Sequence, residues 1–438
     1  MIVTPILLIV IAIVAYIVRP LVTDSVNRVY FFPALGVKIF GAFCVGFIYQ
    51  FYYNGGDTFN YHTHGSRHIW EAFMDSPITG IRLLINDGSN YNEVYRYASK
   101  IVFFTDPGSY AIVKIATMFD LLTFSSYSST AVLFALVSFV GMWMFFLTFY
   151  EQYPQLHRWF AIASFFIPSV FFWGSGLLKD TITLGCLGVA TYQVYRIFIR
   201  KNFGIKHVFL LTVALYGMYS IKIYILLTFL PAVIVWVFLV NLNSIRSPVL
   251  KIMLAPFTLS CAISLGYFAM LKAGEDNAKY SLQNVAMTAK ITAYDIGFYT
   301  GRDAGSGYSL GELDGTFASM VRLSPQAVNV SLFRPYLWEV KNPLMLLSAL
   351  ESFLLLSLCL YIVVKKNISL IAAISSPNVM FALIFSIAFA FAVGVSTFNF
   401  GTLVRYKIPL LPFFAVALIL ILDHSKRDKK LAEFDSTE

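Results

Sequence analysis

Charged and imidazole side chains follow an early apolar segment of the sequence. Asp57 comes directly after two glycines, and His62, His64 and Arg67 follow within ten residues of it. An aspartate or a histidine in this setting can take a proton from a hydroxyl group, as a general base does. An arginine close by can hold a phosphate through charge-assisted hydrogen bonds. We therefore take Asp57, His62 and His64 as candidate catalytic residues and Arg67 as a candidate substrate-binding residue.

Further charged residues occur at the ends of other apolar segments. They are Lys179 with Asp180, then Lys222, then Arg334 with Trp338 and Glu339, and finally Arg405 with Lys407. Cations of this kind can hold a pyrophosphate, Glu339 is a further acidic candidate for catalysis, and Trp338 can stack on a sugar ring. Because placing a charge at membrane depth is unfavourable in free energy, each of these residues is expected to have a structural or functional role. Together they predict a site for an anionic, lipid-anchored substrate.

Several of these residues also have a structural interpretation. Asp57 after two glycines can form a turn, since aspartate favours such positions. Lys179 and Asp180 can form an internal ion pair that helps a helix to start. Lys222 can extend its ammonium group to the membrane interface. The sequence leaves these alternatives open.

The remaining groups differ in how well a structural interpretation fits them. Arg334 and Trp338 can anchor the chain at the membrane interface, where tryptophan is common. Arg405 and Lys407 fall on the side of the membrane that usually carries few cations, which favours a function for them. The three histidines within residues 62–68 do not share one helical face, so we predict no metal site there.

The composition indicates a helical membrane protein. Of the 438 residues, 58% are hydrophobic and only 13% are charged, whereas about a quarter of the residues are charged in a typical soluble domain. The mean hydropathy is +0.73. These values exclude an ordinary soluble enzyme, a disordered chain and a disulfide-built secreted domain. The fold expected is an all-α, polytopic transmembrane bundle.

A membrane span needs about 20 mostly apolar residues, and about eleven segments approach that length. They are 2–18, 35–53, 129–149, 159–175, 181–198, 207–219, 223–240, 251–271, 344–364, 378–395 and 408–422. The stretch 207–240 can also be read as one broken hairpin.

Lysine and arginine in the connections predict the orientation. Alternate connections are rich in these residues, which places them in the cytoplasm with the tail 423–438, and places the N-terminus outside. The opposite, extracytoplasmic side then receives two long loops, 54–128 and 272–343. All the charged groups described above fall on that side.

We expect one integral membrane domain over residues 1–438. Within the first loop, residues 109–124 form an amphipathic stretch that is expected to lie in the membrane interface. The second loop contains a glycine-rich stretch, 301–315, which is typical of a flexible or lid-like segment.

Cysteine usage and net charge exclude two further classes. Each of the four cysteines, Cys44, Cys186, Cys261 and Cys359, lies in an apolar run, so neither a disulfide framework nor a zinc site is expected. The net charge of +9 fits cytoplasmic loops and anionic lipids, and we expect no nucleic-acid partner. No cofactor-binding motif is present.

At these residues the sequence resembles a known group of proteins. The segment Gly55-Gly56-Asp57-Thr58 with Tyr61 resembles the acidic first outer loop of bacterial polysaccharide polymerases and of GT-C membrane glycosyltransferases. The segments 168–180, 333–339 and 399–409 are similar to bacterial multi-spanning proteins related to O-antigen and exopolysaccharide repeat-unit polymerases. The first outer loop has no Asp-x-Asp or Glu-Asp pair, which argues against a metal-dependent mechanism.

The resemblance implies a membrane glycosyltransferase or polymerase of the bacterial cytoplasmic membrane. Its substrate would be a polyprenyl-pyrophosphate-linked glycan at the outer face, and its partners would be membrane lipids and envelope polysaccharide-assembly proteins. Asp57 would be the base, with His62 or His64 as substitutes, and Lys179, Lys222, Arg334 and Arg405 would hold the leaving pyrophosphate.

Two other functions are compatible with the sequence. A transporter or flippase for an anionic lipid-linked or polar solute would have its charges near the membrane midplane, on broken helices and often within inverted repeats. A non-catalytic scaffold of an envelope assembly would depend on its surface and on no single outer charge.

Overall fold

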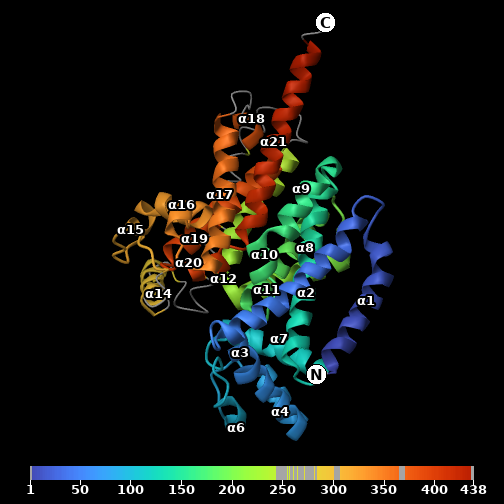
Figure 1. Ribbon diagram of the computed structural model, residues 1–438, viewed down its shortest axis with the longest axis vertical. Coiled ribbons are helices and arrows are strands. Elements are labelled where there is room, and N and C mark those ends of the chain that lie inside the picture. The colour runs from blue at the N-terminus through green and yellow to red at the C-terminus, as the bar shows by residue number, and fades with distance from the viewer. Residues whose placement is uncertain are drawn as a thin grey trace. The chain divides into compact units, whose positions relative to one another are not determined.

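The computed structural model describes residues 2–242, 284–299, 306–364 and 370–435, with scattered positions between 254 and 284; for 425–435 only the backbone is described. These residues form helices throughout (Figure 1). The one pairing of extended backbone among them is an isolated bridge between Gly307 and Asn399. The all-α fold expected from the sequence is therefore confirmed for this part of the chain.

Seven of the described helices are long and apolar enough to cross a membrane. They are α1 (Val3–Val22), α2 (Arg28–Phe51), α8 (Tyr127–Tyr150), α11 (Lys179–Val194) with its π-helical continuation η4 (Tyr195–Ile199), α12 (Ile205–Leu242), α17 (Pro343–Val364) and α19 (Pro377–Val395). Helices α20 (Phe400–Tyr406) and α21 (Leu410–Asp435) are bent by 68° relative to each other and make an eighth span if they are counted together. Such helices indicate a membrane protein.

The described helices support seven or eight spans rather than about eleven. Residues 159–175 divide into α9 (His157–Ala161), the π-helix η3 (Ile162–Phe166) and α10 (Pro168–Trp173), because a proline cannot continue the preceding helix. The expected spans 207–219 and 223–240 both lie in α12, which leaves helical geometry at Lys222 (φ −144°, ψ 78°). The expected span 251–271 lies outside the described residues. The orientation stays a prediction.

The chain divides into two compact units. Unit 1 comprises residues 1–166, 170–193 and 204–222, and unit 2 comprises 167–169, 194–203 and 223–438. Each unit is described by itself below.

In unit 1, glycines allow close packing of α8 with α11. A Cβ atom added to Gly185 would lie 2.9 Å from the carbonyl oxygen of Val137, and one added to Gly141 would collide with the backbone of Gly185. Small residues of this kind allow membrane helices to approach closely. Helix α2 packs against α8, and α1 contacts both of them.

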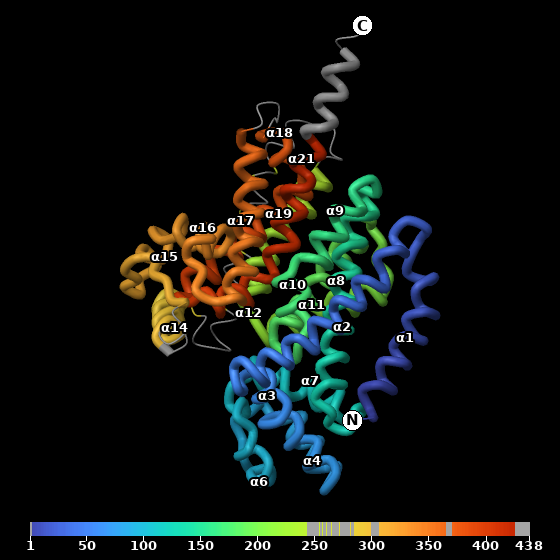
Figure 2. The backbone as a smooth tube through the Cα atoms, in the orientation of Figure 1, coloured from blue at the N-terminus to red at the C-terminus, as the bar shows by residue number. Residues whose placement is uncertain are grey.

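The first expected loop, 54–128, is a set of short helices that follow α2 (Figure 2). They are α3 (Asp57–Tyr61), the π-helix η1 (His62–Ser66), α4 (Arg67–Asp75), α5 (Pro77–Ile85), α6 (Tyr95–Ala98) and α7 (Pro107–Thr123). Helix α7 matches the amphipathic stretch expected at 109–124, and its buried face packs against η1, α4 and α8. Its position in a membrane interface stays a prediction.

Unit 2 contains the second expected loop, 272–343, which is helical over much of its described length. Its helices are α14 (Val285–Tyr299), α15 (Phe317–Arg322), α16 (Ser324–Phe333) and the 3-10 helix η6 (Leu337–Glu339). Part of the glycine-rich stretch, 301–305, lies outside the described residues. A short helix, α18 (Leu370–Ile374), precedes α19, and the expected tail from residue 423 continues α21 as far as Asp435.

Aromatic rings form the core of unit 2. Trp236 stacks on Phe381 with ring centroids 4.2 Å apart, and its indole N–H donates to Oδ1 of Asn378 at 2.7 Å. Phe385 and Phe413 continue this cluster between α19 and α21. Helix α19 also packs against α16, which ends just before Arg334.

Candidate functional site

Five charged residues of unit 1 form what we call the lysine–aspartate group: Asp57, Asp106, Lys179, Asp180 and Lys222. The ammonium nitrogen of Lys179 lies 3.1 Å from a carboxylate oxygen of Asp106, and Lys222 forms a buried ion pair with Asp180. Lys179 also experiences the charges of Lys222 and Asp57. The group therefore joins four residues that the sequence analysis selected from three separate segments, and adds Asp106.

Helix starts position this group. Asp106 caps α7 by accepting a hydrogen bond from the backbone N–H of Ser109 at 3.2 Å, and Lys179 is the first residue of α11. Gly108 permits the approach, because an added Cβ would lie 2.8 Å from the carbonyl oxygen of Ile221 and 3.5 Å from Nζ of Lys179. Lys222 follows directly, at the break in α12.

The charge of Asp106 is maintained against its partial burial. Burial raises the pKa of this carboxyl group, but the charge of Lys179 and the hydrogen bonds from Ser109 and Lys179 outweigh that effect. The pKa of Asp106 therefore lies below its ordinary value, and the carboxylate is ionised at neutral pH. Asp106 escaped the sequence analysis because it lies inside the first loop, away from the end of any predicted span.

Asp57 begins α3 and is partly buried. Gly55 and Gly56, which precede it, have positive φ angles of 129° and 113°, so they form the turn that the sequence suggested. The structural interpretation of Asp57 and its place in the lysine–aspartate group are thus both compatible with the geometry.

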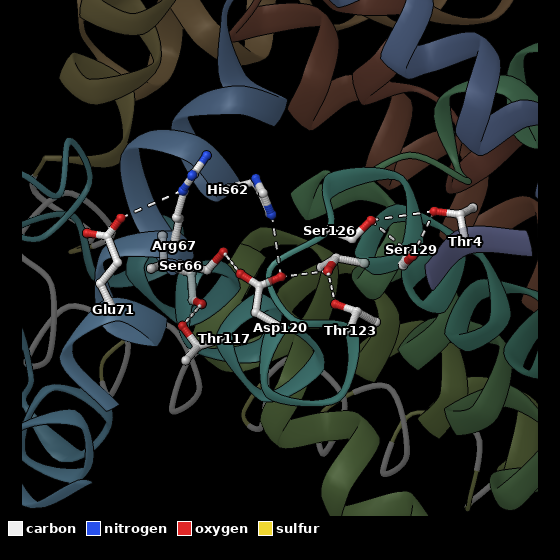
Figure 3. A network of polar contacts seen from close by, with 12 residues as sticks. Thr4, His62, Ser66, Arg67, Glu71, Thr117, Asp120, Thr123, Ser126 and Ser129 are labelled. Atoms are coloured by element: carbon white, nitrogen blue, oxygen red, sulfur yellow. Dashed lines mark hydrogen bonds and ion pairs between the residues drawn. The ribbon is translucent and has the colours of Figure 1, made fainter. Parts of the chain in front are cut away.

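A second polar cluster of unit 1 surrounds Asp120 of α7 (Figure 3). The carboxylate of Asp120 is fully buried and accepts hydrogen bonds from the hydroxyl groups of Ser66 and Thr130, each at 2.6 Å. Nε2 of His62 lies 3.5 Å from its Oδ1 atom. We call His62 and Asp120 the histidine–aspartate pair.

The sequence analysis selected His62 but missed Asp120. A signal was present, because Asp120 is the one acidic residue in the apolar run 109–124. It was overlooked because that run was read as an interfacial helix, whose polar side would face water. In the structure Asp120 lies on the buried face of α7 instead.

Two predicted residues near His62 lie outside both clusters. The side chain of His64 is exposed, although its carbonyl oxygen accepts a hydrogen bond from the N–H of Val102. Arg67 is also exposed and forms an ion pair with Glu71 one turn further along α4. Pairs of this kind on a helix surface contribute little to stability.

In unit 2 the predicted residues Arg334 and Glu339 form, together with Tyr308, Tyr336 and Phe400, what we call the arginine–aromatic group. The guanidinium group of Arg334, just after α16, forms a two-point ion pair with Glu339. It also lies 5.2 Å from the ring centroid of Phe400 and 5.7 to 5.8 Å from those of Tyr308 and Tyr336, within the range of cation–π attraction.

The ion pair in this group holds both partners charged. The hydrogen bond that Arg334 donates to Glu339 raises the pKa of Arg334. Burial raises the pKa of Glu339, but the hydrogen bonds that it accepts from Arg334 and from the backbone N–H of Tyr336 lower the pKa by more. The pKa of Glu339 therefore lies below its ordinary value. Glu339 is therefore an anion that positions Arg334, which makes it a poor proton donor at neutral pH.

Trp338 projects from this group. Its side chain is 81% exposed, and it stacks on Tyr336 with ring centroids 4.7 Å apart. The hydroxyl of Tyr336 contacts the side-chain amide of Asn329 at 3.1 Å, which fixes the ring on which Trp338 rests. An exposed, rigid indole face is suited to a sugar ring or to the membrane interface.

The last predicted pair lies beside this group. Lys407 is buried, and its ammonium group donates to the carbonyl oxygen of Arg334 at 3.3 Å and to the hydroxyl of Ser352 at 3.1 Å. Arg405 lies in α20, the helix that begins with Phe400, and is partly buried. Most of the predicted residues thus lie in or beside two groups, one in each unit, whereas His62 belongs to the histidine–aspartate pair and His64 and Arg67 lie outside these clusters.

Two further buried charges were not selected from the sequence. Lys38 of α2 donates to the hydroxyl of Ser138 and to two backbone carbonyl oxygens of unit 1. Glu351 of α17 accepts hydrogen bonds from the N–H and the hydroxyl of Ser169, each at 2.5 Å. A single charge inside an apolar span was the available signal for each of them.

Metal-ligating residues do not cluster in the described part of the chain: no three or more His, Cys, Asp or Glu side chains there are placed to hold an ion. Comparison of the sequence and structure with models of protein families, with curated proteins and with solved structures gives no significant match.

Proposed function

We propose that this protein is a membrane glycosyltransferase of the polymerase type, acting on polyprenyl-pyrophosphate-linked glycans. The observation that carries the proposal is that Lys179 and Lys222 lie in one charged group with Asp57, although they come from separate helices. Such a group combines cations that can hold a pyrophosphate with a carboxylate that can handle a proton.

In the proposed reaction, a hydroxyl oxygen of an acceptor glycan bonds to the anomeric carbon of the donor sugar. The bond from that carbon to the pyrophosphate oxygen breaks, and its electron pair leaves with the lipid pyrophosphate. The hydroxyl proton passes to a base, for which Asp57 is the first candidate from the sequence. Lys179 and Lys222, held in place by their aspartates before substrate binds, would stabilise the charge that develops on the leaving group.

The arginine–aromatic group, taken by itself, also has side chains that suit a glycan. Arg334 and Lys407 are cations, and the exposed face of Trp338 can stack on a sugar ring. We assign this group, with Arg405, to binding the anionic and sugar portions of substrate. The bacterial cytoplasmic membrane as location, and envelope polysaccharide-assembly proteins as partners, belong to the same proposal.

Complementation of a deletion strain of the source organism tests the proposal, with its surface glycans resolved on a gel. Asp57→Asn and Lys179→Ala should remove the long chains and leave short lipid-linked units. Asp87→Asn and Lys100→Ala are matched controls, because both residues are exposed and lie in the same region of unit 1. If both site variants give the wild-type ladder at matched membrane levels, the proposal is wrong.

One observation favours a transporter as a second candidate. Helix α12 is interrupted at Lys222, which forms a buried ion pair with Asp180, and interrupted helices with buried charges are typical of transporters. A membrane-impermeant label separates the two functions in the deletion strain. Lipid-linked units that the label reaches indicate a missing polymerase, whereas units that it cannot reach indicate a missing flippase.

A further inference from the structure

In the histidine–aspartate pair, both ring nitrogens of His62 lack a hydrogen-bond partner among the described residues. His62 is 2% exposed. Buried polar atoms in folded proteins are nearly always hydrogen-bonded, so an unpartnered one needs an explanation. Figure 3 shows one ring nitrogen pointing at Asp120 and the other pointing away from it.

Asp120 is held rigidly beside this ring. Hydroxyl groups from two different elements, Ser66 of η1 and Thr130 of α8, each donate to one of its carboxylate oxygens. Thr123 in turn contacts the hydroxyl of Thr130 at 2.9 Å. The carboxylate therefore has a fixed direction, and among the described cationic or titratable side chains, His62 is the one within ion-pair distance of it.

This arrangement selects one form of the imidazole. A carboxylate 3.5 Å from Nε2 favours the tautomer in which Nε2 carries the proton. The lone pair of Nδ1 is then available to accept a proton. The same division of roles, in which a fixed carboxylate orients a histidine base, recurs in unrelated hydrolases.

The backbone at His62 also departs from ordinary helical geometry. Residues 62–66 form a π-helix, with His64 outside helical values at φ −103° and ψ 24°. Single turns of π-helix occur frequently at functional sites. Here the π-helix brings His62 and Ser66 to the same carboxylate.

We propose that His62 is the general base of unit 1, accepting the hydroxyl proton of the acceptor at Nδ1, and that Asp120 is its positioning residue. This inference rests on the proposed function and deepens it by moving the base from Asp57 to His62. Asp57 keeps its place in the lysine–aspartate group. The ligand expected at Nδ1 is a hydrogen-bond donor, namely a sugar hydroxyl.

Because His62 is buried, an acceptor can reach its ring only if neighbouring side chains move. The ring lies edge-on to Tyr127 at a centroid distance of 5.5 Å, and the hydroxyl of Tyr127 contacts that of Thr58 in α3 at 2.8 Å. Helix α3 is joined to α2 through Gly55 and Gly56, and glycine has no Cβ atom to restrict the backbone at this connection.

The first experiment measures the tautomer of His62 and does not require activity. Magic-angle-spinning NMR of the ¹⁵N-histidine-labelled full chain in nanodiscs should show a proton on Nε2 and none on Nδ1 of neutral His62. The signal is assigned by its loss in His62→Gln. In Asp120→Asn this preference should disappear. A proton on Nδ1 in the wild-type protein would overturn the positioning role of Asp120.

The second experiment measures transfer by the same preparation, with a polyprenyl-pyrophosphate oligosaccharide as donor. His62→Ala should lower kcat by at least about 100-fold, the scale of general-base catalysis, and added imidazole should restore part of the rate. Asp120→Asn should lower kcat with little change in KM. The double variant should lose little more than His62→Ala alone, because the two residues act as a unit.

The matched control is His68→Ala, a histidine of the adjacent helix α4 whose ring contacts Glu71, and it should retain wild-type activity. Activity in His62→Ala close to wild type, with Lys179→Ala inactive, would overturn the base assignment and leave the proposed function standing. No transfer by the wild-type protein would overturn the proposed function and the base together, and the NMR result would still decide the role of Asp120.

Discussion

The cations of the lysine–aspartate group of unit 1 and of the arginine–aromatic group of unit 2 are stabilised by different surroundings. In unit 1 two ammonium groups face three carboxylates, and Lys179 and Lys222 each have an aspartate partner. In unit 2 the guanidinium group of Arg334 pairs with one carboxylate and contacts three aromatic rings. Lys407 donates a hydrogen bond to the carbonyl oxygen of Arg334.

The difference follows from the chemistry of the two cations. An ammonium group is a compact, strongly hydrated charge, whereas a planar guanidinium group can also stack on aromatic rings. The lysine–aspartate group therefore contains an aspartate partner for each lysine and depends on both ion pairs. The arginine–aromatic group contains one ion pair surrounded by aromatic rings, with the exposed indole of Trp338 beside it.

The largest expected effect is the loss of a buried partner in unit 1. Lys222→Met leaves Asp180 in a buried position without its ammonium group, and should destabilise the protein by about 3–5 kcal/mol. Thermal unfolding of the purified protein in detergent measures this. Lys222→Met with Asp180→Asn should recover part of the loss, and Lys100→Met is the exposed control. Equal stability of Lys222→Met and wild type would show that the stability of unit 1 does not depend on this pair.

A medium effect is expected from the ion pair of unit 2. Glu339→Gln should cost about 2 kcal/mol at neutral pH, because it replaces a charge-assisted hydrogen bond to Arg334. Since the pKa of Glu339 is lowered in the folded state, its contribution is present above its ordinary pKa and is lost as the pH falls through the folded value.

The pH dependence provides the check for this pair. Unfolding midpoints of wild type and Glu339→Gln, measured between about pH 7 and pH 3, should converge as the solution becomes acidic. A constant difference over that range would mean that Glu339 does not stabilise the fold through its charge.

The smallest effect on stability, with a large effect on function, is expected for Trp338. Because its side chain is 81% exposed, Trp338→Ala should change the free energy of unfolding by no more than about 0.5 kcal/mol. The same variant should shorten the glycan ladder. Unchanged glycans in this variant would assign Trp338 to the membrane interface instead.

The all-α fold class predicted from the sequence is confirmed for the described residues, whereas the exact number of spans stays a prediction. Long apolar runs determine that helices form, since each run must satisfy its own backbone hydrogen bonds in lipid. Proline at position 168 and the non-helical backbone at Lys222 altered the division of those runs into helices. The proline is a local signal that mean hydropathy does not register, whereas the break at Lys222 has no proline beside it and was not predictable from hydropathy.

The candidate residues show the same limit. Asp57, Lys179, Asp180 and Lys222 were found because charges at the ends of apolar segments stand out, and the structure brings them into one group. Asp106 and Asp120 were missed, because one lies within a long loop and the other looked like the polar side of a surface helix. Their importance appears only once α7 is packed into unit 1.

The sequence by itself determined that this protein is helical, rich in apolar segments and sparing in its use of charge, because these properties depend on composition and on patterns within one segment. Only the tertiary structure decided which acid faces which cation. Lys179 contacts Asp106, which is 73 residues away in the sequence. His62 of η1 contacts Asp120 of α7, because helix packing brings distant segments within a few ångströms of each other. The fold therefore determines the ion-pair and hydrogen-bond partners of each charged side chain, and these partners determine its chemical role.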